Sequence, residues 1–117
     1  MAKITNEMVQ YSYEIAKKVY KNQLTRTQGK EEIMSHTGMG DASAIGHIYA
    51  FLAMITGEKY TRTINLYATK YFLDQIGIDF GTSAQKQAAR AVLKHVEYYK
   101  TVHAYLPTTD KLAHRYL

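Results

Sequence analysis

The chain has 117 residues, a formal charge of +5 and a pI near 9.3. It contains no cysteine, which excludes disulfide bonds, thiolate chemistry and metal sites with Cys ligands. The lack of cysteine fits the cytoplasm, where we expect this protein. No apolar run approaches the ~20 residues that span a bilayer, so we expect no membrane span. A basic chain of this length is typical of one small domain with an acidic partner such as nucleic acid.

Helical spacing dominates the pattern of apolar residues. A single proline, Pro107, and the lack of strand-like alternation predict an all-α fold. We expect a compact bundle of about five helices that includes a helix-turn-helix-like pair. The expected helices are residues 5–22, 26–37, 42–56, a fourth that starts between 60 and 64 and ends at 77, and 83–103. Residues 1–103 are expected to form a single domain, and residues 104–117 a C-terminal tail with a last helical turn near 111–116.

Residue types that begin or end helices set these bounds. Thr5 is placed to cap the first helix, and Thr25 with Gln28 three residues later has the capping-box pattern of the second. Glycines expected to end helices are Gly38, Gly57 and Gly77. Side chains expected to cap helix starts are Asp41 for the third helix and Thr82 or Ser83 for the fifth.

Residues that could catalyse a reaction are scattered along the chain. Glu31 and Glu32 lie on one exposed turn and have no partner at a spacing that suits acid–base chemistry. The five histidines show no metal-ligand spacing, and His95, beside the apolar stripe of the fifth helix, is typical of a hydrogen-bonded residue at a core edge. We therefore expect no enzyme, no cofactor and no metal ion.

Residues 25–56 have the outline of a helix-turn-helix, because two predicted helices flank a glycine-containing turn. The second helix of this pair lacks Arg and Lys. Its positions expected to be exposed are Asp41, Ser43, Gly46 and His47. If DNA binds here, Ser43 and His47 would contact base edges while other residues hold the phosphates.

The run "GEKYTRTINLYATKYF", residues 57–72, is rich in basic and aromatic residues. If it is helical, Arg62, Asn65 and Thr69 share one side, and Lys59 stands at the helix start. A helix N-terminus with a cation and polar side chains suits an anion or a base edge. The alternative is a solvated helix face with Tyr60 beneath it. The candidate nucleic-acid-binding residues of this run are Lys59, Tyr60, Arg62, Thr63, Asn65, Thr69 and Lys70.

A second basic stripe steps by four residues along the fifth helix, at Lys86, Arg90 and Lys94. Charged outer faces are the default for amphipathic helices, so a solvated face is the favoured interpretation. Arg90 and Lys94 are kept as additional candidates for contact with nucleic acid.

Several stretches resemble a known helical domain. They are the Gly-Met-Gly turn before "SA", the run "GEKYTRTIN", "YFL" with the following "DFG", and "HVEYY" near the end of the fifth helix. Together they resemble the N-terminal helical domain found upstream of HNH-type nuclease domains in bacterial restriction-like endonucleases, over roughly residues 4–100.

The resemblance implies a DNA-reading module whose partner is an HNH nuclease part that this chain lacks, so nuclease activity is not carried over. Its leading candidates are Tyr60, Arg62, Thr63 and Asn65, followed by His95, Tyr98 and Tyr99. By association with restriction, the resemblance also raises modified DNA as a ligand to be tested.

A second hypothesis is a protein-binding protein, such as a small phage-type inhibitor of a host nucleic-acid enzyme. Eleven tyrosines and no catalytic motif fit that hypothesis, because Tyr and Arg are favoured anchors of protein interfaces. A homodimer that uses the tyrosines is compatible with either hypothesis.

Overall fold

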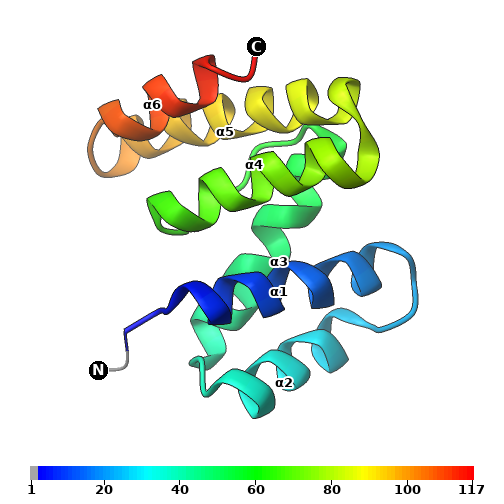
Figure 1. The fold of residues 1–117 in the computed structure, drawn as a ribbon. Helices are drawn as coiled ribbons and strands as arrows, with labels where there is room; N and C mark the ends of the chain where they lie inside the picture. The colour runs from blue at the N-terminus through cyan, green and yellow to red at the C-terminus, as the bar shows by residue number, and fades with distance from the viewer. Residues whose placement is uncertain (1–2) are drawn as a thin grey trace.

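The computed structural model describes residues 3–117, which form six α-helices and no β-strand (Figure 1). The all-α fold predicted from the sequence is confirmed. The helices are α1 (Asn6–Tyr20), α2 (Arg26–Thr37), α3 (Asp41–Thr56), α4 (Leu66–Phe80), α5 (Thr82–Val102) and α6 (Pro107–His114).

Helix α3 runs through the middle of the molecule. Figure 1 shows α1 and α2 side by side at one end, α5 and α6 at the other, and α4 between them. Helix α3 packs against α1, α2 and α5, so neighbours surround most of its length. Its buried positions are Ala44, Gly46, His47, Ile48, Ala50, Phe51, Ala53, Met54 and Ile55.

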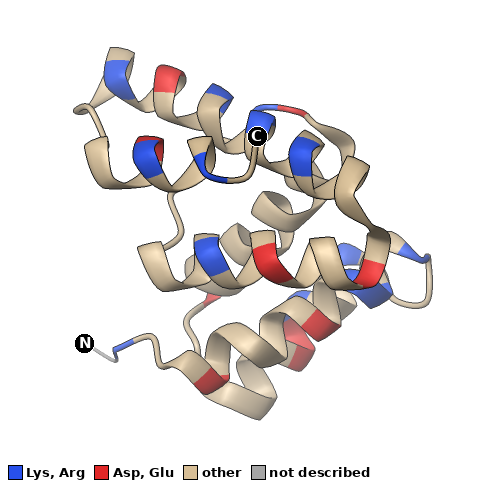
Figure 2. Cartoon of the chain, turned by 45° about the horizontal axis from the view of Figure 1, so that its top comes forward, with Lys and Arg blue, Asp and Glu red and all other residues tan. Residues whose placement is uncertain are grey.

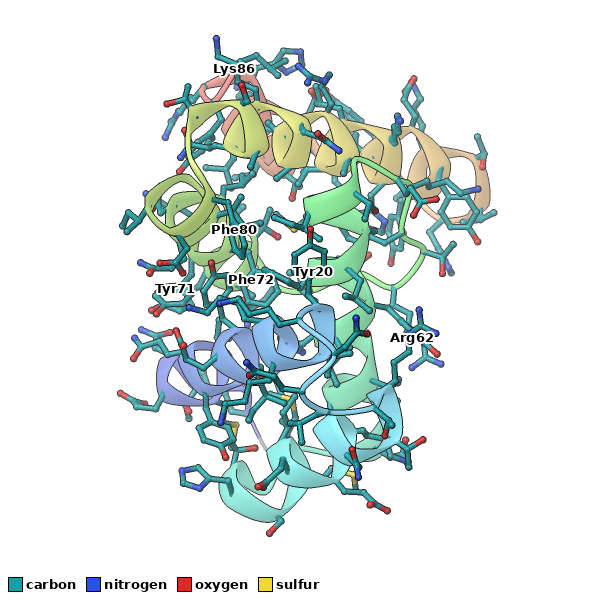
Figure 3. The ribbon with its side chains drawn as sticks, turned by 90° about the vertical axis from the view of Figure 1, so that its right-hand side faces the viewer. Tyr20, Arg62, Tyr71, Phe72, Phe80 and Lys86 are labelled. Atoms are coloured by element: carbon teal, nitrogen blue, oxygen red, sulfur yellow. The ribbon has the colours of Figure 1, made fainter. Side chains whose placement is uncertain are left out.

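Aromatic rings fill the core where α1, α3 and α4 meet. Tyr13 packs edge-on against Phe51 with ring centroids 5.3 Å apart, and it lies 5.5 Å from Phe72. Figure 3 shows Phe72 within the molecule. The Tyr13 hydroxyl donates to Asp79 at 2.9 Å, and Lys17 pairs with the same carboxylate at 2.9 Å. The hydrogen bond from Lys17 lowers the pKa of Asp79, so the carboxylate stays charged and ties α1 to α4.

The predicted helix ends are partly confirmed. Thr5 caps α1, and Thr25 and Gln28 exchange the two hydrogen bonds of a capping box at 2.9 and 3.0 Å. Gly38 and Gly57 end α2 and α3 in the left-handed conformation, with φ of 79° and 77°.

Three predicted helix ends are wrong. Glycines, not side chains, precede α3 and α5: Gly40 and Gly81 occupy the N-cap positions, so Asp41 and Thr82 are already helical. Gly77 does not end α4, which continues to Phe80. It leaves space for the Gln85 side chain, whose amide would lie 2.3 Å from an added Cβ and donates to the Leu73 carbonyl at 3.1 Å.

The segment from residue 104, expected to be a tail, is mostly helical. Helix α6 starts at Pro107, which suits a first helical position because it needs no backbone donor there. Leu112 and Ala113 are buried, and α6 packs on α5 and α4. The Tyr116 hydroxyl donates to Asp74 at 2.7 Å. The segment therefore covers part of the core. Within residues 3–117, no helix combines the length and apolar character that crossing a membrane requires.

Close packing of α1 on α2 depends on Gly29, because a Cβ there would lie 2.7 Å from Val19 and 3.3 Å from Ile15. We expect Gly29→Ala to lower the free energy of unfolding by about 1–3 kcal/mol through overpacking. Gly46→Ala is the matched control. Its Cβ would lie 3.6 Å from Arg62, so the better helix propensity of alanine should leave stability unchanged or raise it by up to about 1 kcal/mol. Urea unfolding measures both, and equal effects of the two variants would contradict this account.

Candidate nucleic-acid interface

An irregular segment, residues 57–65, joins α3 to α4. Helix α4 begins at Leu66, and Asn65 is its N-cap, accepting from the Ala68 N–H at 2.8 Å. The expected single helix face therefore does not exist, because Arg62 and Asn65 precede the helix. Thr69 is 1 % exposed and its hydroxyl donates to the Asn65 carbonyl at 3.0 Å. Thr69 is thus part of the core and cannot contact DNA.

His95 on α5 fixes the irregular segment in place. Its Nδ1 lies 2.7 Å from the Tyr60 carbonyl, and its Nε2 lies 2.9 Å from the Thr63 hydroxyl. Because a carbonyl only accepts, Nδ1 carries the hydrogen and Nε2 accepts from Thr63. The ring also stacks on Tyr60, with centroids 4.3 Å apart and planes within 7°. Burial lowers the pKa of His95, so the neutral form that makes both bonds is favoured.

Tyr60 was predicted to contact nucleic acid, and the structure places it elsewhere. It is 4 % exposed, with its ring packed on His95 in the core. Burial also raises the pKa of its hydroxyl. Tyr60 therefore anchors the segment and does not lie on the surface.

The cations on either side of Tyr60 face solvent. Lys59 and Arg62 are exposed, and the Lys59 Nζ lies 4.5 Å from the centroid of the Tyr98 ring. Arg62 donates to the Ala42 carbonyl at 3.0 Å, which orients its guanidinium along the start of α3. In Figure 3, Arg62 points outward on the side of the molecule opposite Tyr71.

Two adjoining hollows, of about 610 and 660 Å³, have Lys59 in common. The first lies between α3, the start of α2 and the irregular segment, and the second runs along α5. We call this surface the basic groove, and define it by Arg26, Tyr49, Lys59, Arg62, Arg90, Lys94 and Tyr98.

Charge in the basic groove is mainly positive. Two carboxylates, Glu58 and Glu97, also line it. Glu97 pairs with Lys100 outside the groove, and Glu58 accepts from Thr56. Within residues 3–117, none of the five groove cations forms an ion pair. Across the described part of the chain, the groove therefore offers cations that no carboxylate pairs with directly.

Lys94 lines the groove, and its ammonium also donates to the Gly57 carbonyl at 2.7 Å. Other basic residues lie away from the groove. Lys70, a predicted site residue, instead pairs with Asp74 at 2.8 Å and lies near Tyr116. Figure 2 shows Lys and Arg spread over several helices and interspersed with Asp and Glu. The groove is thus a local feature and not one charged face of the whole molecule.

Helix α3 is too buried to act as a recognition helix. Gly46 and His47, both expected to be exposed, are buried by the packing around α3. His47 nevertheless lines a hollow of about 410 Å³ beside the groove, which we call the His47 hollow. Residues that line it include Ser43, Gly46, His47, Arg62, Thr63 and Asn65. Arg62 lines both the His47 hollow and the first hollow of the basic groove. Five of the predicted site residues come together in the His47 hollow, namely Ser43, His47, Arg62, Thr63 and Asn65.

Sequence reasoning missed Arg26 and Tyr49. The guanidinium of Arg26 lies 5.6 Å from the centroid of the Tyr49 ring, at the edge of the groove. Two signals were available. Arg26 is a cation in the first turn of a helix, where the dipole disfavours positive charge. Tyr49 is a large aromatic residue on the exposed side of a helix that is otherwise apolar.

Within the part of the chain that the structure describes, no three His, Asp or Glu side chains come together in a way that could hold a metal ion.

Comparison with protein-family models, with curated proteins and with solved structures finds no match to this chain.

Stability should depend on the neutral forms of His47 and His95. Burial lowers the folded-state pKa of each below the ordinary 6.5, so the unfolded chain takes up protons first as pH falls. The stabilisation is complete above about pH 6.5 and is lost as pH falls from there through the folded pKa values. We expect a lower urea midpoint at about pH 5 than at about pH 7.5, and a flatter pH dependence in His95→Gln.

The control is His103→Gln, since His103 is exposed. An unchanged pH dependence in His95→Gln, or a flatter one in His103→Gln, would contradict the assignment.

Proposed function

We propose that this chain is a DNA-binding module that holds duplex DNA, including modified DNA, in the basic groove. The observation that carries the proposal is the set of five cations without carboxylate partners along one groove. Unpaired Lys and Arg side chains release condensed counterions from the phosphate backbone when DNA binds. Cations already held in ion pairs contribute much less to that term.

The groove is organised before any ligand arrives. His95 holds the irregular segment, which sets the positions of Lys59 and Arg62 on either side of Tyr60. The hydrogen bond from Arg62 to the Ala42 carbonyl further restricts the orientations that the guanidinium can adopt. Such preorganisation lowers the entropy that is lost on binding, so fewer contacts suffice for a given affinity.

The mode of binding differs from that of a helix-turn-helix. Helix α3 cannot enter a major groove, because α1, α2 and α5 surround it. Contacts with bases must therefore come from the irregular segment and from Ser43 at the start of α3. The sequence resemblance to the domain upstream of HNH-type nucleases rests in part on the same segment, and from it we propose such a nuclease as the partner.

A protein partner is the second candidate, and one surface favours it. A groove of about 620 Å³ lies on the side of Tyr71, away from Arg62 (Figure 3), and it is both aromatic and acidic. Tyr11 and His36 stack there with centroids 3.9 Å apart, beside carboxylates that include Glu14. Aromatic rings beside carboxylates suit a basic protein surface, as expected of an inhibitor or a dimer. DNA-independent recovery of a stoichiometric partner would favour this candidate.

Arg62→Ala should weaken DNA binding about tenfold, because it removes a cation that lines both the basic groove and the His47 hollow. Arg115→Ala is the matched control, since Arg115 is exposed and does not line the groove. Fluorescence anisotropy with a labelled duplex at ~50 mM salt measures both, and the wild-type affinity should fall steeply as salt rises. Circular dichroism verifies that each variant is folded.

Equal losses in the two variants would indicate diffuse attraction without a site. No binding to any duplex, modified or unmodified, even in the weak non-specific range would overturn the proposed function.

A further inference from the structure

We propose that the His47 hollow binds a phosphate monoester group, meaning a terminal phosphate that still carries a proton. As applied to DNA, the inference rests on the proposed function, because the phosphate would then be a strand end. The same chemistry is offered by free inorganic phosphate, and the experiment below separates the two sources.

The unusual group in the hollow is the imidazole of His47. Its Nδ1 lies 2.7 Å from the Ser43 carbonyl, so Nδ1 carries the hydrogen and Nε2 presents a lone pair. The residue is 4 % exposed, and Nε2 has no hydrogen-bond partner within residues 3–117. A buried polar atom without a partner is costly, which makes this nitrogen a candidate to accept a bond from a ligand.

Hydrogen-bond donors line the same hollow as that acceptor. Arg62 borders the hollow, with the hydroxyl of Ser43 and the side-chain amide of Asn65. The first residues of α3 and the N-cap of α4 also line the hollow, so the N-termini of two helices lie nearby. These helices are 16 and 15 residues long. Helix N-termini carry N–H groups without intrahelical acceptors and favour negative charge. The residues that line the hollow include no Asp or Glu.

This set of groups selects among anions. A phosphodiester or a sulfate carries no proton at neutral pH and would place an anionic oxygen against the Nε2 lone pair. A phosphate monoester has its second pKa near 6, so part of the population keeps a P–OH. That hydroxyl can donate to Nε2 while the other oxygens accept from Arg62, Ser43 and Asn65. The arrangement therefore matches a protonated terminal phosphate better than an internal one.

Access to Nε2 requires a small movement. The atom is shielded from water, so a ligand reaches it only when side chains that line the hollow shift. Ile4, ahead of α1, and Arg62 are two such side chains. The bond from Arg62 to the Ala42 carbonyl is one that a phosphate oxygen can replace.

The first experiment uses the whole chain with inorganic phosphate, and with sulfate as an anion of similar size that has no proton to donate. The ring nitrogen signals of His47 are followed by NMR at about pH 6.5, where inorganic phosphate carries a proton that it can donate and a phosphate monoester does so in part. We expect phosphate, and not sulfate, to shift the Nε2 signal. A shift with neither anion, or equal shifts with both, would overturn the inference. Because no DNA is present, this result stands even if the proposed function fails.

The second experiment compares one duplex with 5′-phosphate ends and with 5′-hydroxyl ends. We expect about tenfold tighter binding of the phosphorylated duplex, as one charge-assisted contact typically provides. The preference should fall to about one in His47→Leu, survive in part in His47→Gln, which keeps a polar end, and persist in Arg115→Ala. A preference that persists in His47→Leu would overturn the inference. A phosphate-specific shift without any end preference supports the site with free phosphate as its source.

Discussion

The hydrogen bonds of His95 are the constraint on which the candidate site depends. One buried imidazole binds the Tyr60 carbonyl and the Thr63 hydroxyl, and it stacks on the Tyr60 ring. These contacts hold the nine-residue connection between α3 and α4 against α5. Because both ring nitrogens have partners, the buried polar group adds specificity without leaving an unsatisfied atom. The exposed cations Lys59 and Arg62 take their positions from this anchor.

The central position of α3 determines where the basic groove and the His47 hollow meet. Helix α3 passes through the centre, so its exposed edge becomes a wall shared by the basic groove and the His47 hollow. Arg62 stands where the two meet, within van der Waals reach of Gly46, where a Cβ would lie 3.6 Å from it. A fold with a buried central helix thus presents its polar groups through the connecting segment and not through a protruding helix. In that respect the proposed interface follows from the packing.

Local signals predicted most of the fold. The 3.6-residue spacing located α1, α2, α3 and α5. The caps at Thr5 and Thr25 and the left-handed glycines at 38 and 57 act within a few residues, so sequence alone identifies them. The start of α4 was missed because Tyr60 and Ile64 fit a helical spacing, while the bonds to His95 that keep this segment irregular come from 35 residues away. The burial of His47 and Thr69 was missed for the same reason, because neighbouring helices cover faces that look polar in the sequence.

The most direct test of the account is a map of backbone amide shifts in the ¹⁵N-labelled chain during titration with a duplex. The account predicts that the largest changes fall on the irregular segment at residues 57–65, with smaller ones at Arg26, Tyr49 and the Arg90–Lys94 turn of α5. Changes centred on the acidic surface around Tyr11 and His36, or changes spread evenly over all exposed lysines, would contradict it.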